Sequence, residues 1–213
     1  MNRFATTLVL AVAVSAAAVS SASAGVPSPA NSTLPACMAL CPMGDMPFTV
    51  TVRDLANNPV AGSAVVLDFS GCPNGAFICP PHPPDPYTVN LAARTLLMVT
   101  AANGSVTFPA RIGGVGPAGC AKVFADGVLL RSYALASPDQ NGNGVAVIIV
   151  DVDDALFAAK LGTVDPTADF DCSGGVVDAA DQLIFNQHLS HSCEGIVDAI
   201  GRRTWGSLKQ HYR

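Results

Sequence analysis

The sequence is poor in the side chains from which a catalytic site is built. Charged residues make up 13% of the chain. Between Gly25 and Pro138 there are five aspartates, no glutamate and one histidine, His82, which we expect to be exposed. A hydrolase needs a nucleophile with an oriented base, or two carboxylates facing each other across a cleft. No spacing pairs these groups, so we expect a protein that is not an enzyme.

Basic side chains are scarce where acidic ones gather. The stretch from Asp139 to Cys193 holds nine of the sixteen acidic residues and a single base, Lys160. A nucleic-acid partner requires a basic stripe, so this distribution argues against one. Crowded carboxylates repel one another unless cations neutralise them, although a solvated acidic face is the alternative.

Long apolar runs are confined to the start of the chain. Met1-Asn-Arg3 precedes an apolar stretch that ends near Val19, and the small residues Ala22-Ser-Ala24 follow. This is the pattern of a secretory signal peptide over residues 1–24. We therefore expect bacterial export to the extracellular space or the cell surface. No later run is long enough for a transmembrane segment.

Seven cysteines follow this leader: Cys37, Cys41, Cys72, Cys79, Cys120, Cys172 and Cys193. An oxidising compartment favours disulfides among them. Cys172 and Cys193 could join an acidic loop to the end of the helix after it, and Cys72 and Cys79 could pin a proline-rich loop. The connectivity stays open, and the odd count leaves at least one cysteine unpaired or intermolecular.

Zinc is the rival use of these cysteines. Cys37-x-x-x-Cys41 is a weak zinc signal, because no second pair of cysteines or histidines accompanies it at compact spacing. His188 and His191, three residues apart, could hold a metal weakly, but this spacing favours the exposed surface of a helix.

The middle of the chain predicts short β-strands separated by turns. Alternating apolar residues and turn dipeptides indicate strands at 48–53, 64–69, 96–100, 105–108, 121–124 and 128–133. Asn103-Gly104 and Asp126-Gly127 are hairpin signals. Together they predict an antiparallel sandwich at 47–136, after a flexible, cysteine-containing segment at 25–46.

Two sequence segments of this region resemble a known family of domains. FTVTVRDLANNPVAGSAVVLDF and TAANGSVTFPA resemble the bacterial Ig-like domains of invasin and intimin type, or the related carboxypeptidase-regulatory-like modules. The resemblance implies an Ig-like β-sandwich that serves as a spacer or an adhesive surface.

Oxygen-bearing side chains recur at alternate positions after Ala168. Asp169, Asp171 and Ser173 precede two glycines, and Asp178 and Asp181 follow them. A hard cation such as Ca²⁺ needs oxygen ligands at alternate residues, a glycine turn, and a closing acid supplied by the next helix. The apolar spacing after Asp181 predicts that helix.

The loop and its helix recur about thirty residues upstream. Placing Asp153 on Asp181 aligns Leu156 with Ile184 and Phe157 with Phe185 without a gap. The sequence therefore contains an internal repeat of two loop-helix units.

This repeat resembles a type I dockerin at about 139–193, within a module that we place at 137–193. The resemblance implies two calcium loops and a cohesin-like partner. Its ligands would be Asp169, Asp171, Ser173, Val176 by its carbonyl, Asp178 and Asp181 in the second loop, and Asp139, Asn141, Asn143, Val145 and Asp153 in the first. The second loop fits if one of Gly174 and Gly175 is an insertion. The first has three extra residues before Asp153 and apolar residues at 146–150, so calcium is favoured at the second.

The chain after Cys193 forms a basic amphipathic tail at 194–213. Trp205, Leu208 and Tyr212 lie at near-helical spacing, which predicts packing on the preceding helices or contact with a partner or the cell envelope.

These patterns together predict a mainly β protein with a small helical module. The expected function is attachment at the cell surface or in an extracellular complex through protein–protein interaction. Calcium is expected to stabilise the helical module that makes this contact. The alternatives are an accessory subunit of a polysaccharide-degrading system, and a structural adhesin whose calcium loops have decayed.

Overall fold

A computed structural model describes residues 25–73, 76–83, 85–146 and 152–196. The predicted signal peptide lies outside these residues. So do the apolar insert at 147–150 and the part of the basic tail after Ile196, with Trp205, Leu208 and Tyr212.

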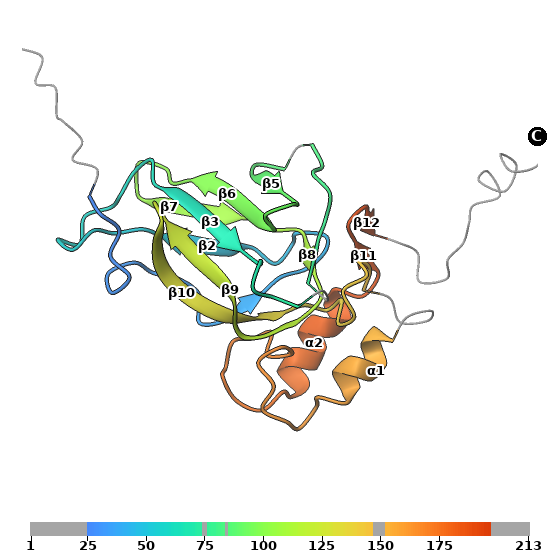
Figure 1. The fold of residues 1–213 in the computed structure, drawn as a ribbon. Helices are drawn as coiled ribbons and strands as arrows, with labels where there is room; N and C mark the ends of the chain where they lie inside the picture. The colour runs from blue at the N-terminus through green and yellow to red at the C-terminus, as the bar shows by residue number, and fades with distance from the viewer. Residues whose placement is uncertain (1–24, 74–75, 84, 147–151, 197–213) are drawn as a thin grey trace, which may run out of the picture.

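The fold is mainly β, as the sequence predicts, with two short helices in the described ranges (Figure 1). Its largest element is a curled sheet of six strands. Their order across the sheet is β1 (Met38–Ala39), β10 (Val128–Ala136), β9 (Gly116–Ala125), β3 (Ala64–Asp68), β6 (Thr95–Val99) and β5 (Thr88–Asn90). Neighbouring strands are antiparallel, except that β1 runs parallel to β10.

Shorter strand pairs accompany this sheet: β2 (Phe48–Thr51) with β7 (Ser105–Phe108), β4 (Phe77–Ile78) with β8 (Ile112–Gly113), and β11 (His191–Ser192) with β12 (Gly195–Ile196). Successive side chains of a strand point to opposite faces. Phe48 and Val50 of β2 are accordingly buried, while Thr49 between them is exposed. Phe48 meets Tyr133 of β10 edge to face, with ring centroids 5.7 Å apart, so β2 and the large sheet share one apolar core.

The two predicted hairpins have different outcomes. Asp126-Gly127 joins β9 to β10 as an antiparallel pair, which confirms the hairpin predicted there. The hairpin predicted at Asn103-Gly104 is wrong, because β7 pairs with β2 while β6 stays beside β3. The turn there is local, and the Asn103 side chain accepts the Ser105 N–H at 3.0 Å.

The segment at 25–46, which we expected to be flexible, lies against the β region. Thr33 and Thr51 exchange backbone hydrogen bonds of 2.8 and 2.9 Å. Met38 and Leu40 are fully buried. Burial of these apolar side chains opposes the flexibility that proline and serine in this segment suggested.

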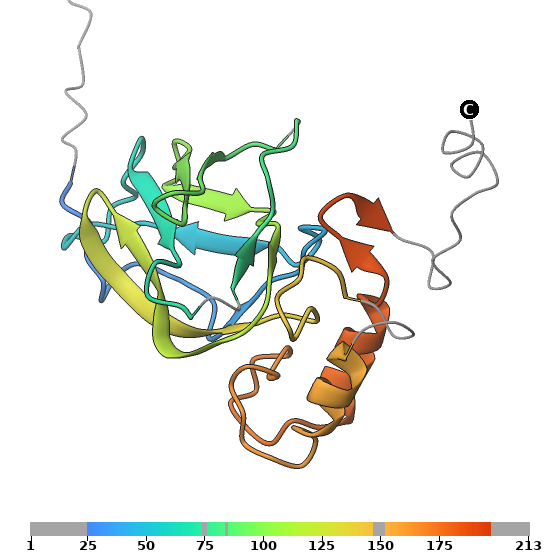
Figure 2. The same ribbon diagram turned by 45° about the vertical axis from the view of Figure 1, so that its right-hand side comes forward.

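Two helices lie at one end of the β region (Figures 1 and 2). They are α1 (Asp153–Ala158), which begins at the predicted closing acid Asp153, and α2 (Ala179–Gln187), which holds the closing acid Asp181 in its first turn. Phe157 of α1 and Phe185 of α2 stack in parallel, with ring centroids 4.3 Å apart, and Phe170 packs beside both. Phe157 and Phe185 are the residues that the repeat aligns, so equivalent positions face each other in this second apolar cluster.

Disulfides join the helical end to the rest of the chain. Cys37 pairs with Cys172, Cys79 with Cys193, and Cys72 with Cys120. The presence of disulfides is confirmed, whereas the pairings considered from sequence, Cys172 with Cys193 and Cys72 with Cys79, are wrong. Nearness along the chain suggested them, but folding brings distant segments closer. No helix in the described part of the chain has the length and apolar character that crossing a membrane requires.

Candidate metal centre

The second acidic loop brings three carboxylates to one point. Oxygens of Asp169, Asp171 and Asp181 all lie within 4.8 Å of one another. Asp169 is 6% exposed and Asp181 is fully buried. Backbone N–H groups orient them: Ser173 and Gly174 donate to Asp169 at 3.0 and 2.9 Å. Three oxygen donors at this separation are the beginning of a site for a hard cation.

Asp181 closes the loop from the first turn of α2. Its Oδ1 accepts the N–H groups of Phe170 and Asp171 at 2.7 and 3.1 Å. Its Oδ2 accepts the Asp178 N–H at 3.0 Å. Asp181 therefore fastens both ends of the loop to the helix, and its predicted role as a calcium ligand stays a prediction.

The first loop repeats this hydrogen-bond pattern. Asn143 and Gly144 donate to Asp139 at 3.1 and 2.7 Å, as Ser173 and Gly174 do to Asp169. The Asn141 N–H reaches Asp153 at 3.0 Å, as the Asp171 N–H reaches Asp181. Both Asp139 and Asp153 are fully buried. The loops are thus alike in backbone geometry as well as in sequence.

Residues in the second half of each loop complete the likeness. Val177, in the second loop, exchanges backbone hydrogen bonds of 2.9 Å with Gly162 and Thr163, after α1. Ala146, in the first loop, exchanges bonds of 2.9 and 2.5 Å with His191 and Ser190, after α2. Each loop is therefore joined to the end of the other unit's helix, which locks the two units together.

The charges of the second loop are unbalanced. In the described ranges, the ion pairs of basic side chains lead to Asp45, Asp85 and Asp165, and none reaches this loop. Burial raises the pKa of Asp169, and Asp171 and Asp181 add to the rise. The pKa of Asp171 is lowered, chiefly because the Ser173 N–H stabilises its charge. Without a cation, ionising Asp169 is thus more costly than ionising Asp171.

Some predicted ligands have other contacts. The Asp178 side chain accepts the Ala180 N–H at 2.7 Å and caps α2, and it lies outside the group of three carboxylates. The Ser173 hydroxyl accepts the Gly175 N–H at 3.3 Å. Val176 is 47% exposed. In the first loop, Val145 pairs with Ser192 of β11 through a backbone bridge.

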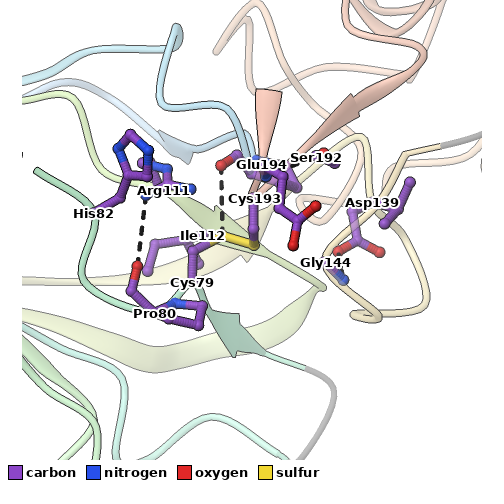
Figure 3. Close-up of a disulfide and its surroundings, with 12 residues drawn as sticks. Cys79, Pro80, His82, Arg111, Ile112, Asp139, Gly144, Ser192, Cys193 and Glu194 are labelled. Atoms are coloured by element: carbon purple, nitrogen blue, oxygen red, sulfur yellow. Dashed lines mark hydrogen bonds between the residues drawn. A yellow bond between two sulfur atoms is a disulfide. The ribbon is translucent and has the colours of Figure 1, made fainter. Parts of the chain in front are cut away.

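The first loop is packed against the β region. The Gly114 N–H donates to the Asp139 carbonyl at 2.7 Å, and a side chain at Gly113 would overlap the Asp139 carboxylate. Figure 3 shows Asp139 and Gly144 on one side of the Cys79–Cys193 disulfide and Arg111 and His82 on the other. His82 is exposed, as predicted.

A second group of donor atoms was missed in the sequence. The Cys41 cluster consists of Cys41, Asp45, His188 and His191. The helix-surface role expected for His191 is wrong, because this residue lies in β11, beside Cys41 and Asp45. The weak signals at Cys41 and at the two histidines were both visible, but nothing in the spacing indicated that they meet.

Comparison with known proteins identifies no related protein or structure. No family model matches this chain, and neither a curated protein nor a solved structure does. Function must therefore be inferred from the residues themselves.

Proposed function

We propose that this chain is a secreted, non-catalytic attachment protein, in which calcium stabilises a dockerin-like pair of loops beside an Ig-like β-sandwich. The dockerin-like module would bind a cohesin-like or other cell-surface partner, and the sandwich would act as a spacer. Calcium would have a structural role, since it holds loops and helices in place and carries no reaction.

One observation carries this proposal: three carboxylates of the second loop converge while no basic side chain of the described residues pairs with them. Taking ionised carboxylates out of water is costly unless a cation or strong hydrogen bonds compensate. Backbone N–H groups of the loop supply part of that compensation. A divalent cation bound by Asp169, Asp171 and Asp181 would supply the rest.

Export is supported by the disulfides. They are typical of chains that fold in an oxidising compartment, and six of the seven cysteines are paired. This agrees with the secretory signal expected from the sequence.

Calcium titration of the purified chain tests the proposal. With calcium at about 100 times its dissociation constant, one site adds about 2.7 kcal/mol to the free energy of unfolding. We expect this to raise the melting temperature by roughly 5–10 °C in a chain of this size. Calorimetry would count the sites, and we expect the second loop to fill first.

Matched variants locate the effect. Asp169→Asn and Asp181→Asn should each abolish the calcium-induced rise. Asp154→Asn, which removes an exposed carboxylate from the first turn of α1, should leave it intact. If chelation with EDTA and later addition of calcium leave the melting temperature of the unaltered chain unchanged, the calcium proposal is wrong.

Two related functions differ in measurable ways. An accessory subunit of a polysaccharide-degrading system would bind the same kind of partner, so a pull-down from a glycan-degrading complex would detect it. An adhesin with decayed loops would bind no calcium in calorimetry. The convergence of the three carboxylates favours the calcium-binding function over this last one.

A further inference from the structure

The Cys41 cluster joins two distant parts of the chain. Cys41 and Asp45 follow β1, in a turn closed by a 2.9 Å hydrogen bond from the Gly44 N–H to the Cys41 carbonyl. His188 ends α2 and His191 begins β11. The left-handed backbone at Ser190, with φ of 69°, turns the chain between the two histidines.

The donor atoms lie within a few tenths of an ångström of the separations of a tetrahedral metal site. Cys41 Sγ lies 3.5 Å from His191 Nδ1, and Asp45 Oδ2 lies 3.1 Å from the same nitrogen. All three atoms are within 4.8 Å of one another. With Zn–S of about 2.3 Å and Zn–N or Zn–O of about 2.0–2.1 Å, neighbouring tetrahedral donors are about 3.3–3.6 Å apart.

His188 is oriented as a fourth donor. Its Nδ1 lies 2.7 Å from the Ile184 carbonyl, which can only accept, so Nδ1 carries the proton. In the neutral ring this leaves the Nε2 lone pair facing Asp45 Oδ2, at 3.7 Å. A metal-binding histidine commonly donates its other ring N–H to a backbone carbonyl in this way. A proton on Nε2, or a cation between the two groups, would remove the repulsion between that lone pair and the carboxylate.

Cys41 differs from every other cysteine of the chain. The other six form disulfides, and Cys41 alone is a free thiol. It is fully buried, so it cannot reach a cysteine of another molecule without unfolding. Sulfur, imidazole and carboxylate together are a donor set that suits zinc, whereas the all-oxygen set of the loops suits calcium.

We infer that Cys41, Asp45 and His191 bind a zinc ion, with His188 closing the fourth position. The ion would bridge the turn after β1 to the end of α2, a link between residues 150 apart in sequence. Asp45 and His188 also line a cavity of about 250 Å³, which gives the ion a route from solvent.

Zinc binding would replace a proton on sulfur. Burial raises the pKa of the Cys41 thiol, and the Met43 N–H lowers it by a smaller amount. The free thiol is therefore protonated at neutral pH. Zinc takes the thiolate, so one proton is released for each ion bound and the affinity rises with pH.

Metal titration of the purified, disulfide-intact chain tests this inference. We expect one zinc ion per chain in competition with a chromogenic chelator, and no displacement by excess calcium. Cobalt in place of zinc should give the near-ultraviolet charge-transfer band of a thiolate ligand. Cys41→Ser should abolish that band. His188→Ala should lower zinc affinity by at least about 10–100-fold, the loss usual for a group that only orients a ligand.

Two further variants separate this site from the loops. Asp45→Asn changes a partly exposed side chain, so the chain should fold and lose tight zinc binding even if Cys41→Ser fails to fold. Asp169→Asn should leave zinc binding unchanged, since its carboxylate belongs to the second loop. Absence of stoichiometric zinc, or equal zinc affinity in the unaltered chain and Asp45→Asn, would overturn the inference. Neither result bears on calcium.

Discussion

The two acidic loops have the same internal hydrogen bonds and opposite surroundings. The first is held against the β region: a side chain at Gly144 would come within 2.8 Å of Phe77, and Asp139 contacts the backbone of Gly113 and Gly114. The second is tied to the segment before β1 by the Cys37–Cys172 disulfide but is open at its glycine turn, where a side chain at Gly174 would meet nothing within 4 Å. The same loop hydrogen-bond pattern thus occurs in a packed environment in the first loop and beside solvent at the glycine turn of the second.

The difference separates two uses of a buried carboxylate. Asp139 orders a junction between the helical end and the β region, where backbone N–H groups stabilise its charge. Asp169 has similar partners and faces Asp171 and Asp181. We expect the first loop to act mainly as packing and the second to respond to cations.

The largest expected difference is between Asp139→Asn and Asp169→Asn without calcium. Asp139 accepts N–H groups on both oxygens, and hydrogen bonds to a charged group are worth about 1.5–3 kcal/mol. Asp139→Asn should therefore lower the free energy of unfolding by about 3 kcal/mol. Asp169→Asn should cost less, because it also removes repulsion from Asp171 and Asp181.

Urea denaturation in EDTA measures both free energies. Equal losses in the two variants would show that the loops are equivalent and would remove the basis of this comparison. Circular dichroism of each variant before denaturation controls for misfolding.

A smaller difference is expected between the equivalent glycines. Gly144 and Gly174 both have left-handed backbones, with φ of 85° and 69°, where alanine costs about 1–2 kcal/mol. In Gly144→Ala the new methyl would also press on Phe77, which adds about 1–3 kcal/mol. Gly174→Ala has only the backbone cost. The melting temperature should therefore fall further in Gly144→Ala than in Gly174→Ala. A larger loss in Gly174→Ala would contradict the packing described for the two loops.

The smallest effect concerns pH. Burial raises the pKa of Asp169, so the folded, calcium-free chain takes up this proton at higher pH than the unfolded chain does. The ionised group therefore costs stability above its folded pKa, and the cost disappears as pH falls through it. Protons then compete with calcium. The calcium-induced rise in melting temperature should shrink from neutral to mildly acidic pH, and a rise that stays constant would exclude Asp169 as a ligand.

Local patterns predicted much of the fold. Alternation located β2, β3 and β7, and the apolar spacing after each closing acid located α1 and α2. These signals succeed because each depends on neighbouring residues alone. The repeat also anticipated that Phe157 and Phe185 are equivalent, although their stacking came only from the structure.

Contacts between distant segments were not predictable in this way. The pairing of β7 with β2, the partners of Cys172 and Cys193, and the meeting of Cys41 with His191 all join residues that no local period relates. Asp178 shows a subtler limit. A carboxylate just before a helix satisfies a ligand pattern and an N-cap pattern equally, and the structure shows the N-cap hydrogen bond to the Ala180 N–H.

The disulfides also determine how the chain would respond to mechanical force. Tension applied between Gly25 and Ile196 would follow the shortest covalent path, which crosses from Cys37 to Cys172 and bypasses the 134 residues between them. The loaded path then runs through α2, which lies between Cys172 and Cys193. Unfolding of the sheet could not lengthen the molecule under load while these bonds remain oxidised. Only the segments at 25–37 and 172–196 would extend under load until a reductant opened the Cys37–Cys172 bond.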